Sequence, residues 1–232
     1  MKSQTQNEAS SKLVIIGDGE IAQLAYEYFT YDSPHQVVAF SVERQFLKQT
    51  ELFGLPIIAF EDLQLAYAPA DYKVFVGISY VKLNRLRTRL YRQAKEKGYS
   101  AVSFVSSTAS VWRNVEIGEN CFILENNILQ YGVKIGNNVT MWGANHVGHH
   151  SVIKDNCFVT GHVLIAGRSE IGENCFLGAS SCIGDYVSIA ADCVIGAGAV
   201  VLKNTEALKV YRGNPAQPSP LDSFAVFNVK ES

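Results

Sequence analysis

Residues 165–178 read IAGRSEIGENCFLG and belong to a pattern that runs from Val111 to Val201. Every sixth residue of that stretch is apolar, sixteen times in succession. With 47% apolar residues in the chain, chance gives such a run in the best of six registers with a probability on the order of 10⁻⁵, so the stretch is a repeat. The apolar positions are Val111, Ile117, Ile123, Leu129, Ile135, Met141, Val147, Ile153, Val159, Ile165, Ile171, Leu177, Ile183, Ile189, Ile195 and Val201.

The six-residue period predicts a prism of short parallel strands. It matches neither the 3.6 residues of a helical turn nor the two-residue alternation of a plain strand. With three sides to a coil, eighteen residues complete one turn, and coils stack at the strand spacing of roughly 4.8 Å. We expect the apolar residue and the small residue four positions later to point inward. Gly, Asn and Asp should take the corners that need a positive φ.

The cysteines fit this prism better than a disulfide or a zinc site. Four of the five stand at the inward small position of the repeat, and no Cys-x-x-Cys occurs. Reduced cysteine is among the most buried residue types. We therefore expect core packing for Cys121, Cys157, Cys175 and Cys193.

Length and charge exclude several classes of protein. The 232 residues allow two modest domains with cores of their own. A net charge of −2 and a pI near 6.2 disfavour a nucleic-acid or membrane-surface binder. No apolar run approaches the ~20 residues of a membrane span, and the polar start of the chain does not resemble a signal peptide. We expect a cytoplasmic protein.

We predict four segments along the chain. Residues 1–11 form a disordered tail, residues 12–105 an α/β domain, residues 106–216 the all-β prism, and residues 217–232 an irregular C-terminal tail. Within 12–105, strands are expected at 13–16, 37–40, 56–59, 73–76 and 101–105. One helix follows Gly17, and another carries Leu83, Leu86, Leu90 and Ala94 on one face. This alternation predicts a small parallel sheet, a Rossmann-like half.

A glycine-rich loop joins the first strand to the first helix. Gly17, Asp18, Gly19 and Glu20 begin the pattern Gly-x-Gly-x-x-Ala, in which backbone N–H groups can approach a phosphate at a helix N-terminus. About one hundred residues are few for a full dinucleotide fold, so a nucleotide diphosphate attached to a sugar is favoured over NAD, and a purely structural sheet stays open. Glu43 is the acidic candidate after the second strand.

Other charged side chains of this region are expected on the surface. Arg85, Arg87 and Arg89 could reach a diphosphate, but a solvated helix face is the preferred interpretation. His35 is also expected at the surface.

Four of the five histidines fall in one coil of the prism and at its edges, namely His146, His149, His150 and His162. The register puts His149 and His150 at a corner, pointing outward. Eighteen residues on, Gly167 stacks above His149, and the column continues with Asp185 and Lys203. An exposed imidazole can take a proton from an attacking amine or hydroxyl. A glycine N–H can stabilise the oxyanion formed on a thioester carbonyl, so this corner is the candidate site for acyl transfer.

The repeat resembles that of the hexapeptide-repeat acyltransferases, and residues 13–216 resemble the nucleotide-sugar acetyltransferases of the PglD and NeuD type. The matching pieces are Gly17-Asp18-Gly19, Val76-Gly77, the His149 corner, Ile165-Ala166-Gly167, Asn174-Cys175-Phe176-Leu177-Gly178 and Gly213-Asn214-Pro215-Ala216. The resemblance implies a left-handed parallel β-helix and a homotrimer with active sites between subunits. It also implies acetyl-CoA as donor and, as acceptor, an amino group on a UDP- or dTDP-linked deoxysugar.

The resemblance assigns expected roles to individual residues. His149 matches the general base, and Gly167 matches the glycine that binds the acetyl carbonyl. Ala179 and Ala197 match positions along the acetyl-CoA channel, and the charge and position of Lys203 suggest a contact with CoA phosphates. The residues expected to bind the nucleotide sugar are Gly17, Asp18, Gly19, Glu20, Glu43, Gly77, His146, His150 and His162.

The chain departs from the family pattern at three places. His150 stands where the family commonly has an acidic residue after the base. Phe158 replaces a second family histidine, and Ser41 with Val42 replaces an acidic pair that follows the second strand.

Three alternatives remain open. O-acetylation of a sugar hydroxyl, as in sialic-acid modification, would use the same base. A γ-class carbonic anhydrase would bind zinc with histidines of two subunits, which needs His149 or His150 to pair with His162. A non-catalytic trimeric scaffold would leave the histidines without a role. We expect an acetyl-CoA-dependent N-acetyltransferase of a nucleotide-linked amino sugar, with no metal, no nucleic acid and no membrane partner.

Overall fold

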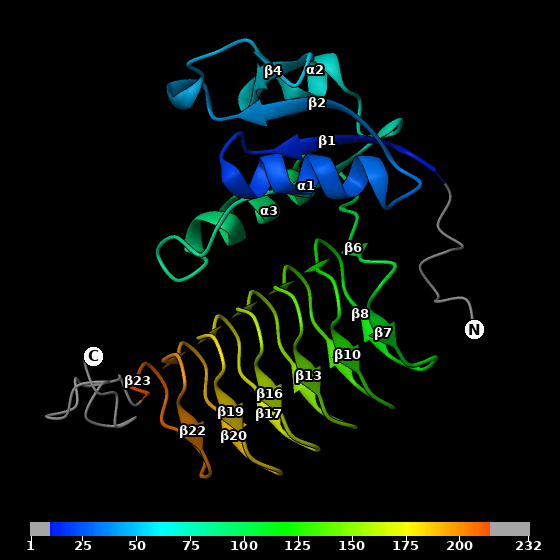
Figure 1. Cartoon of the computed structure of the whole chain (residues 1–232). Helices are drawn as coiled ribbons and strands as arrows, with labels where there is room; N and C mark the ends of the chain where they lie inside the picture. The colour runs from blue at the N-terminus through cyan, green and yellow to red at the C-terminus, as the bar shows by residue number, and fades with distance from the viewer. Residues whose placement is uncertain (1–9, 214–232) are drawn as a thin grey trace, which may run out of the picture.

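The computed structural model describes residues 10–213, which form an α/β layer seated on a β-helix (Figure 1). The predicted tails and the motif at Asn214-Pro215-Ala216 lie wholly or largely outside these residues. No helix in the described range is long and apolar enough to cross a membrane. The N-terminal elements are β1 (Lys12–Ile16), α1 (Glu20–Tyr31), β2 (Gln36–Val42), η2 (Arg44–Phe46), β3 (Glu51–Leu52), β4 (Leu55–Ala59), η3 (Phe60–Asp62), α2 (Leu63–Ala66), β5 (Tyr72–Val76) and α3 (Arg85–Glu96).

The N-terminal sheet has the strand order β3-β4-β2-β1-β5. β1, β2, β4 and β5 are parallel, as predicted, whereas the short edge strand β3 pairs antiparallel with β4. The sheet is therefore mixed, because residues 51–55 form a tight hairpin that the strand pattern did not reveal. Its two faces are covered by α1 on one side and by α2 and α3 on the other, and each face has its own apolar cluster.

The β-helix is made of two-residue strands that pair in parallel with the strand eighteen residues on, as His146 pairs with Leu164. The last pair is the exception, since Val194 pairs with Val210, sixteen residues on. The strands form three sheets. Sheet 1 contains β7 (Ser110–Val111), β10 (Ile128–Leu129), β13 (His146–Val147), β16 (Leu164–Ile165), β19 (Cys182–Ile183) and β22 (Val200–Val201). Sheet 2 contains β8 (Glu116–Ile117), β11 (Lys134–Ile135), β14 (Val152–Ile153), β17 (Glu170–Ile171) and β20 (Ser188–Ile189). Sheet 3 contains β6 (Phe104–Val105), β9 (Phe122–Ile123), β12 (Thr140–Met141), β15 (Phe158–Val159), β18 (Phe176–Leu177), β21 (Val194–Ile195) and β23 (Val210–Tyr211).

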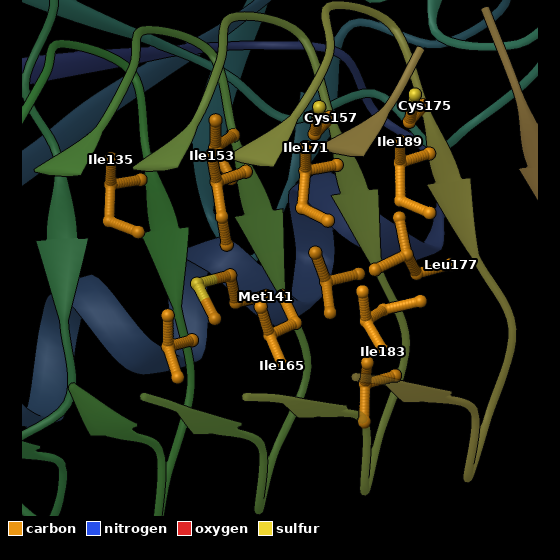
Figure 2. Close-up of a cluster of buried hydrophobic side chains, with 14 of the residues drawn as sticks. Ile135, Met141, Ile153, Cys157, Ile165, Ile171, Cys175, Leu177, Ile183 and Ile189 are labelled. Atoms are coloured by element: carbon orange, nitrogen blue, oxygen red, sulfur yellow. The ribbon is translucent and has the colours of Figure 1, made fainter. Parts of the chain in front are cut away.

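The apolar repeat fills the interior, which confirms the predicted register. Figure 2 shows Ile135, Ile153, Ile171 and Ile189 in one row, each from a successive coil of sheet 2. The four predicted inward cysteines are fully buried free thiols. The corners take a positive φ once in every six residues from Asn120 to Gly198. Asn, Gly and Asp hold many of these corners as expected, but His150 and His162 also adopt a φ of 59°.

The α/β layer sits on the outer face of sheet 3. Phe122 on this face packs against Phe75 and Phe104, with ring centroids 5.3 and 5.5 Å apart. The predicted last strand at 101–105 is shared between the two parts, since Ala101 bridges to Val74 whereas β6 pairs with β9 of sheet 3.

Arg87 contradicts the prediction of a solvated arginine face. Its guanidinium is fully buried and donates to the carbonyl oxygens of Val76 (3.1 Å), Asn120 (2.7 Å) and Asn138 (2.6 Å). Burial lowers the pKa of Arg87 to about 10, which still leaves the group charged at neutral pH. Arg87 therefore ties the end of β5 to two successive corners of the β-helix.

His35 was also predicted wrongly. It is buried, and its Nδ1 shares a hydrogen bond of 2.8 Å with the Ser11 hydroxyl. Its ring lies 6.0 Å from that of Phe29 in the core beneath α1. A histidine before a strand gives no sequence sign of this packing.

Candidate active site

A cavity of about 750 Å³ opens at the carboxyl ends of β1, β2 and β5. This edge of a parallel sheet is where α/β folds bind nucleotides. The structure brings together there all six residues of the α/β part that the sequence analysis proposed. These are Gly17, Asp18, Gly19, Glu20, Glu43 and Gly77.

Gly17 and Gly77 let three segments of the chain pack closely beside the cavity, because neither residue carries a Cβ. Gly17 has a φ of +123°, and a Cβ on it would lie 2.7 Å from the carbonyl oxygen of Gly77. A Cβ on Gly77 would lie 2.9 Å from the Cα of Ala22. Gly19, by contrast, faces open space and precedes α1, which has no side-chain N-cap in the described structure. The first N–H groups of α1 are thus exposed toward the cavity, as in an anion site.

Glu43 and Arg89 form an ion pair at the cavity. The two Arg89 nitrogens donate to the two Glu43 oxygens at 2.9 and 2.8 Å, and this hydrogen bonding raises the pKa of Arg89. Arg85 instead pairs with Asp192 of the β-helix. Of the three arginines, only Arg89 therefore interacts with a residue that lines the cavity.

Several lining residues were not predicted as ligands. The hydroxyl of Ser41 is fully buried and has no hydrogen-bond partner among residues 10–213, so it is available to a ligand. Tyr80 packs against Phe158 and Phe176, with ring centroids 5.0 and 5.1 Å away. Trp142 lines the cavity from the β-helix side. The available sequence signal for Trp142 was an aromatic residue directly after the apolar repeat position Met141.

The predicted column above His149 is present. His149 follows β13 at the corner between sheets 1 and 2 and is exposed. A Cβ on Gly167 would lie 2.9 Å from both Nε2 and Cε1 of His149, and 3.4 Å from Oδ1 of Asp185. The imidazole therefore covers the bare Cα of Gly167, with Asp185 on the coil beyond. Lys203, the next member, is exposed.

His150 contacts His149 directly. Their Nδ1 atoms lie 3.1 Å apart, and the two rings are nearly perpendicular at 86°. The backbone N–H of His149 donates to Oε1 of Gln130 at 3.1 Å. The ring of His150 packs on Tyr131 of the preceding coil, with centroids 5.1 Å apart.

The remaining candidates lie elsewhere on the prism. His146 is on β13 in sheet 1, next to the corner of His149. His162, Ala179 and Ala197 lie at the other edge of sheet 1, at the corner with sheet 3. Figure 1 shows β13, β16 and β17 on the side of the β-helix away from α1 and α3. One chain thus brings neither its own cavity nor Ala179 and Ala197 to His149.

No group of three or more His, Cys, Asp or Glu side chains within residues 10–213 is arranged to hold a metal ion. In particular, His162 is separated from His149 and His150 by the width of sheet 1. A metal site of the carbonic-anhydrase kind is therefore not formed inside one chain.

Comparison with known proteins identifies the repeats. Residues 168–203 match a family model described as bacterial transferase hexapeptide (six repeats). Residues 114–141 match one described as hexapeptide repeat of succinyl-transferase. No curated protein matches the chain.

Solved structures resemble the chain over most of its length. The acetyltransferase domain of PglB from Neisseria gonorrhoeae has a TM-score of 0.79 and 22% identity, covering 90% of this chain and 99% of that domain. PerB from Caulobacter crescentus, solved with CoA and GDP-perosamine, has a TM-score of 0.78 and 26% identity, covering 89% and 96%. A histidine-to-asparagine variant of perosamine N-acetyltransferase from the same organism, with the same ligands, has a TM-score of 0.76 and 25% identity, covering 89% and 96%. In its repeats and its fold, the chain is thus similar to hexapeptide-repeat acyltransferases, with perosamine N-acetyltransferase and PerB among its structural neighbours.

Proposed function

We propose that the protein transfers the acetyl group of acetyl-CoA to an amino group of a nucleotide-linked deoxysugar. The observation that carries this proposal is the exposed imidazole of His149 above the bare Cα of Gly167. Two structural neighbours support the choice of ligands, since PerB was solved with CoA and GDP-perosamine and the PglB domain with acetyl-CoA.

The nucleotide end of the substrate belongs in the cavity of about 750 Å³. Backbone N–H groups at the start of α1 bind the diphosphate, because the helix N-terminus carries partial positive charge. The unpartnered Ser41 hydroxyl hydrogen-bonds the nucleoside. Tyr80 and Trp142 flank the exit along which the sugar extends. UDP, dTDP and GDP sugars are the candidates.

In the chemical step, the amine nitrogen attacks the thioester carbonyl carbon and forms the new C–N bond. Nε2 of His149 takes the proton that the amine loses. The N–H of Gly167 donates to the oxyanion of the tetrahedral intermediate. Collapse of the intermediate breaks the C–S bond, and the departing CoA thiolate recovers the proton from the imidazolium.

A homotrimer supplies the groups that one chain keeps apart. The outer face of sheet 1 exposes the apolar side chains Ile128, Leu164 and Val200, which suits contact with a second copy. Such a contact brings the corner of Ala179 and Ala197 of one subunit to the His149 corner of its neighbour. The pantetheine arm of acetyl-CoA lies between them, and Lys203 contacts the CoA phosphates.

The first test is release of free thiol from acetyl-CoA over a panel of UDP-, dTDP- and GDP-linked amino sugars. We expect turnover with at least one of them, and a loss of about 10²–10⁴-fold in His149→Asn. Treatment of the product with hydroxylamine separates O- from N-acetylation, because it cleaves the ester and leaves the amide intact. Equal turnover in both proteins, or none in either, would retire the proposal. Metal analysis of protein purified without a chelator or affinity tag tests the carbonic-anhydrase alternative.

A second test asks whether one site draws on two subunits. His149→Asn removes the base, and Gly19→Trp fills the cavity from a position with open space around it. In trimers assembled from equal amounts of both variants, about a quarter of the sites combine an intact cavity with an intact histidine of the neighbour. We expect about a quarter of wild-type activity. If cavity and histidine of the same chain worked together, the mixture would stay inactive.

A further inference from the structure

The imidazole of His150 lies beside that of His149, and in the hydrogen bond between them one ring must donate and the other must accept. The two Nδ1 atoms are 3.1 Å apart, so one of them must carry a hydrogen and the other must not. Cε1 and Nε2 of His149 face Gly167, and each would lie 2.9 Å from a Cβ on that residue; of these two atoms, only Nε2 can bind a proton. Under the proposed function this nitrogen receives the proton of the amine, and it can do so only if it is unprotonated beforehand.

We infer that His150 is the positioning residue of the base, whose Nδ1 accepts a hydrogen bond from the Nδ1–H of His149. This bond selects the tautomer of His149 that leaves Nε2 free and fixes the ring over Gly167. The opposite assignment would place the hydrogen of His149 on Nε2 and block proton transfer. The inference rests on the proposed function for its catalytic part and on geometry for the tautomer.

The preceding coil holds His150 in place. Its backbone N–H donates to the carbonyl of Tyr131 at 2.9 Å, and the two rings meet edge to face at 71°. Below it, a Cβ on Gly132 would lie 3.2 Å from Cδ2 of His150. Gln130 binds the backbone N–H of His149 in the same coil. Residues 130–132 thus support the ring of His150 and the backbone of His149.

An imidazole nitrogen without a hydrogen differs in one way from a carboxylate as the partner of His149. It accepts the same hydrogen bond, but it does not offset the positive charge that His149 gains during attack. An aspartate at position 150 would do both. Aspartate and asparagine also tolerate the positive φ of 59° at this corner. We therefore expect His150→Asp to equal or exceed the wild-type kcat.

Asp185 is the other group that could orient His149. Its Oδ1 lies on the coil beyond Gly167, 3.4 Å from the position of the missing Cβ, and the edge of the imidazole that faces this position is formed by Nε2 and Cε1. A carboxylate on that side would favour a hydrogen on Nε2, the tautomer that cannot act as base. If His150 orients His149, the hydrogen is on Nδ1, whereas if Asp185 orients it, the hydrogen is on Nε2. These two tautomers can be distinguished by measurement.

The kinetic test compares wild type with His150→Ala, His150→Asp and the control Asn174→Ala. Asn174 is half-buried and has a φ of 59° at the corner between sheets 2 and 3, so its replacement reports the cost of alanine in a left-handed corner away from sheet 1. We expect His150→Ala to lower kcat about 10–100-fold with KM for both substrates within about twofold. His150→Asp restores kcat, and Asn174→Ala leaves it unchanged. Unchanged kcat in His150→Ala, or a rise in KM alone, would overturn the inference.

The tautomer test needs no turnover. Long-range ¹H–¹⁵N spectra of histidine-labelled protein distinguish a ring protonated at Nδ1 from one protonated at Nε2, and the His149 signals are assigned by their loss in His149→Asn. We expect His149 protonated at Nδ1 in the wild type and a shift toward Nε2 in His150→Ala. Nε2 protonation in the wild type refutes the inference. If His149 is protonated at Nδ1 but the protein acetylates no sugar, the hydrogen bond between the two histidines is confirmed and only the proposed function is rejected.

Discussion

Replacing Gly167 by alanine should displace the imidazole of the proposed base, His149, without lowering the stability of the fold. The added Cβ would lie 2.9 Å from Nε2 and Cε1 of His149, whereas ordinary contacts fall between 3.4 and 4 Å. The imidazole must therefore retreat by roughly 0.5–1 Å, and a misplacement of about 1 Å can cost about 10²-fold in rate. We expect kcat to fall about 10–100-fold.

The same substitution should not destabilise the protein. The side chain that it meets is exposed and can rotate away, and the φ of Gly167 lies outside the left-handed region. Gly→Ala at such a position stabilises by about 0.4–1 kcal/mol through the unfolded chain. We therefore expect the Tm to stay level or rise slightly.

Gly172→Ala is the matched control. Its Cβ would lie 2.6 Å from the backbone nitrogen of Ala191, and backbone cannot rotate away as a side chain can. Overpacking of this kind costs about 1–3 kcal/mol, so Tm should fall while kcat of the folded enzyme is retained. Thermal unfolding and thiol release on both variants test the reasoning. A Gly167→Ala protein with wild-type kcat, or one that loses activity only as it unfolds, would refute it.

Three further predictions concern the α/β layer. Arg87→Met leaves three buried carbonyl oxygens without donors, so urea unfolding should show a loss of at least about 3 kcal/mol; a smaller loss would mean that the β-helix and α3 separate easily. Ser41→Ala removes a hydroxyl that has no hydrogen-bond partner among residues 10–213, so KM for the nucleotide sugar should rise about 2–13-fold. KM for acetyl-CoA and the Tm should not change. A lower Tm with an unchanged KM would instead assign Ser41 to the core. Burial and the hydrogen bond to Glu125 raise the pKa of Tyr28 to about 12 from 10.0, so the folded state keeps a proton that the unfolded state loses. The stability of wild type relative to Tyr28→Phe should therefore be constant below pH 10 and decline between pH 10 and 12, and a flat difference in chemical denaturation across that window would contradict this.

The interior of the β-helix could be predicted because one physical demand repeats there. Each inward position needs an apolar or small residue of a size that stacks on its copy eighteen residues away, as Ile153 stacks between Ile135 and Ile171. The column of His149 and Gly167 follows from the same count. Register alone placed these two residues together.

Contacts between the α/β layer and the β-helix could not be predicted from the six-residue repeat. Arg87 belongs to a helix whose other arginines are exposed, and its burial depends on carbonyls of Asn120 and Asn138 that the fold brings to it. The contact between the Nδ1 atoms of His149 and His150 depends on ring orientation at a corner, which spacing does not specify. Trp142 reaches the cavity only because the α/β layer covers sheet 3.

The outward positions of the repeat distinguish the three sides of the prism. On sheet 3 four of the seven are phenylalanine, such as Phe122 and Phe158, which are buried. On sheet 2 three of the five are charged, and Lys134 pairs with Glu116 at 3.1 Å, as suits a face in water. On sheet 1 three of the six are apolar yet exposed, namely Ile128, Leu164 and Val200. Since one face binds the chain's own α/β layer and one carries the charges, we expect the third to be covered by another subunit. The proposed base, His149, lies at the edge of that third face, which is why we expect the donor site to be completed by a neighbour.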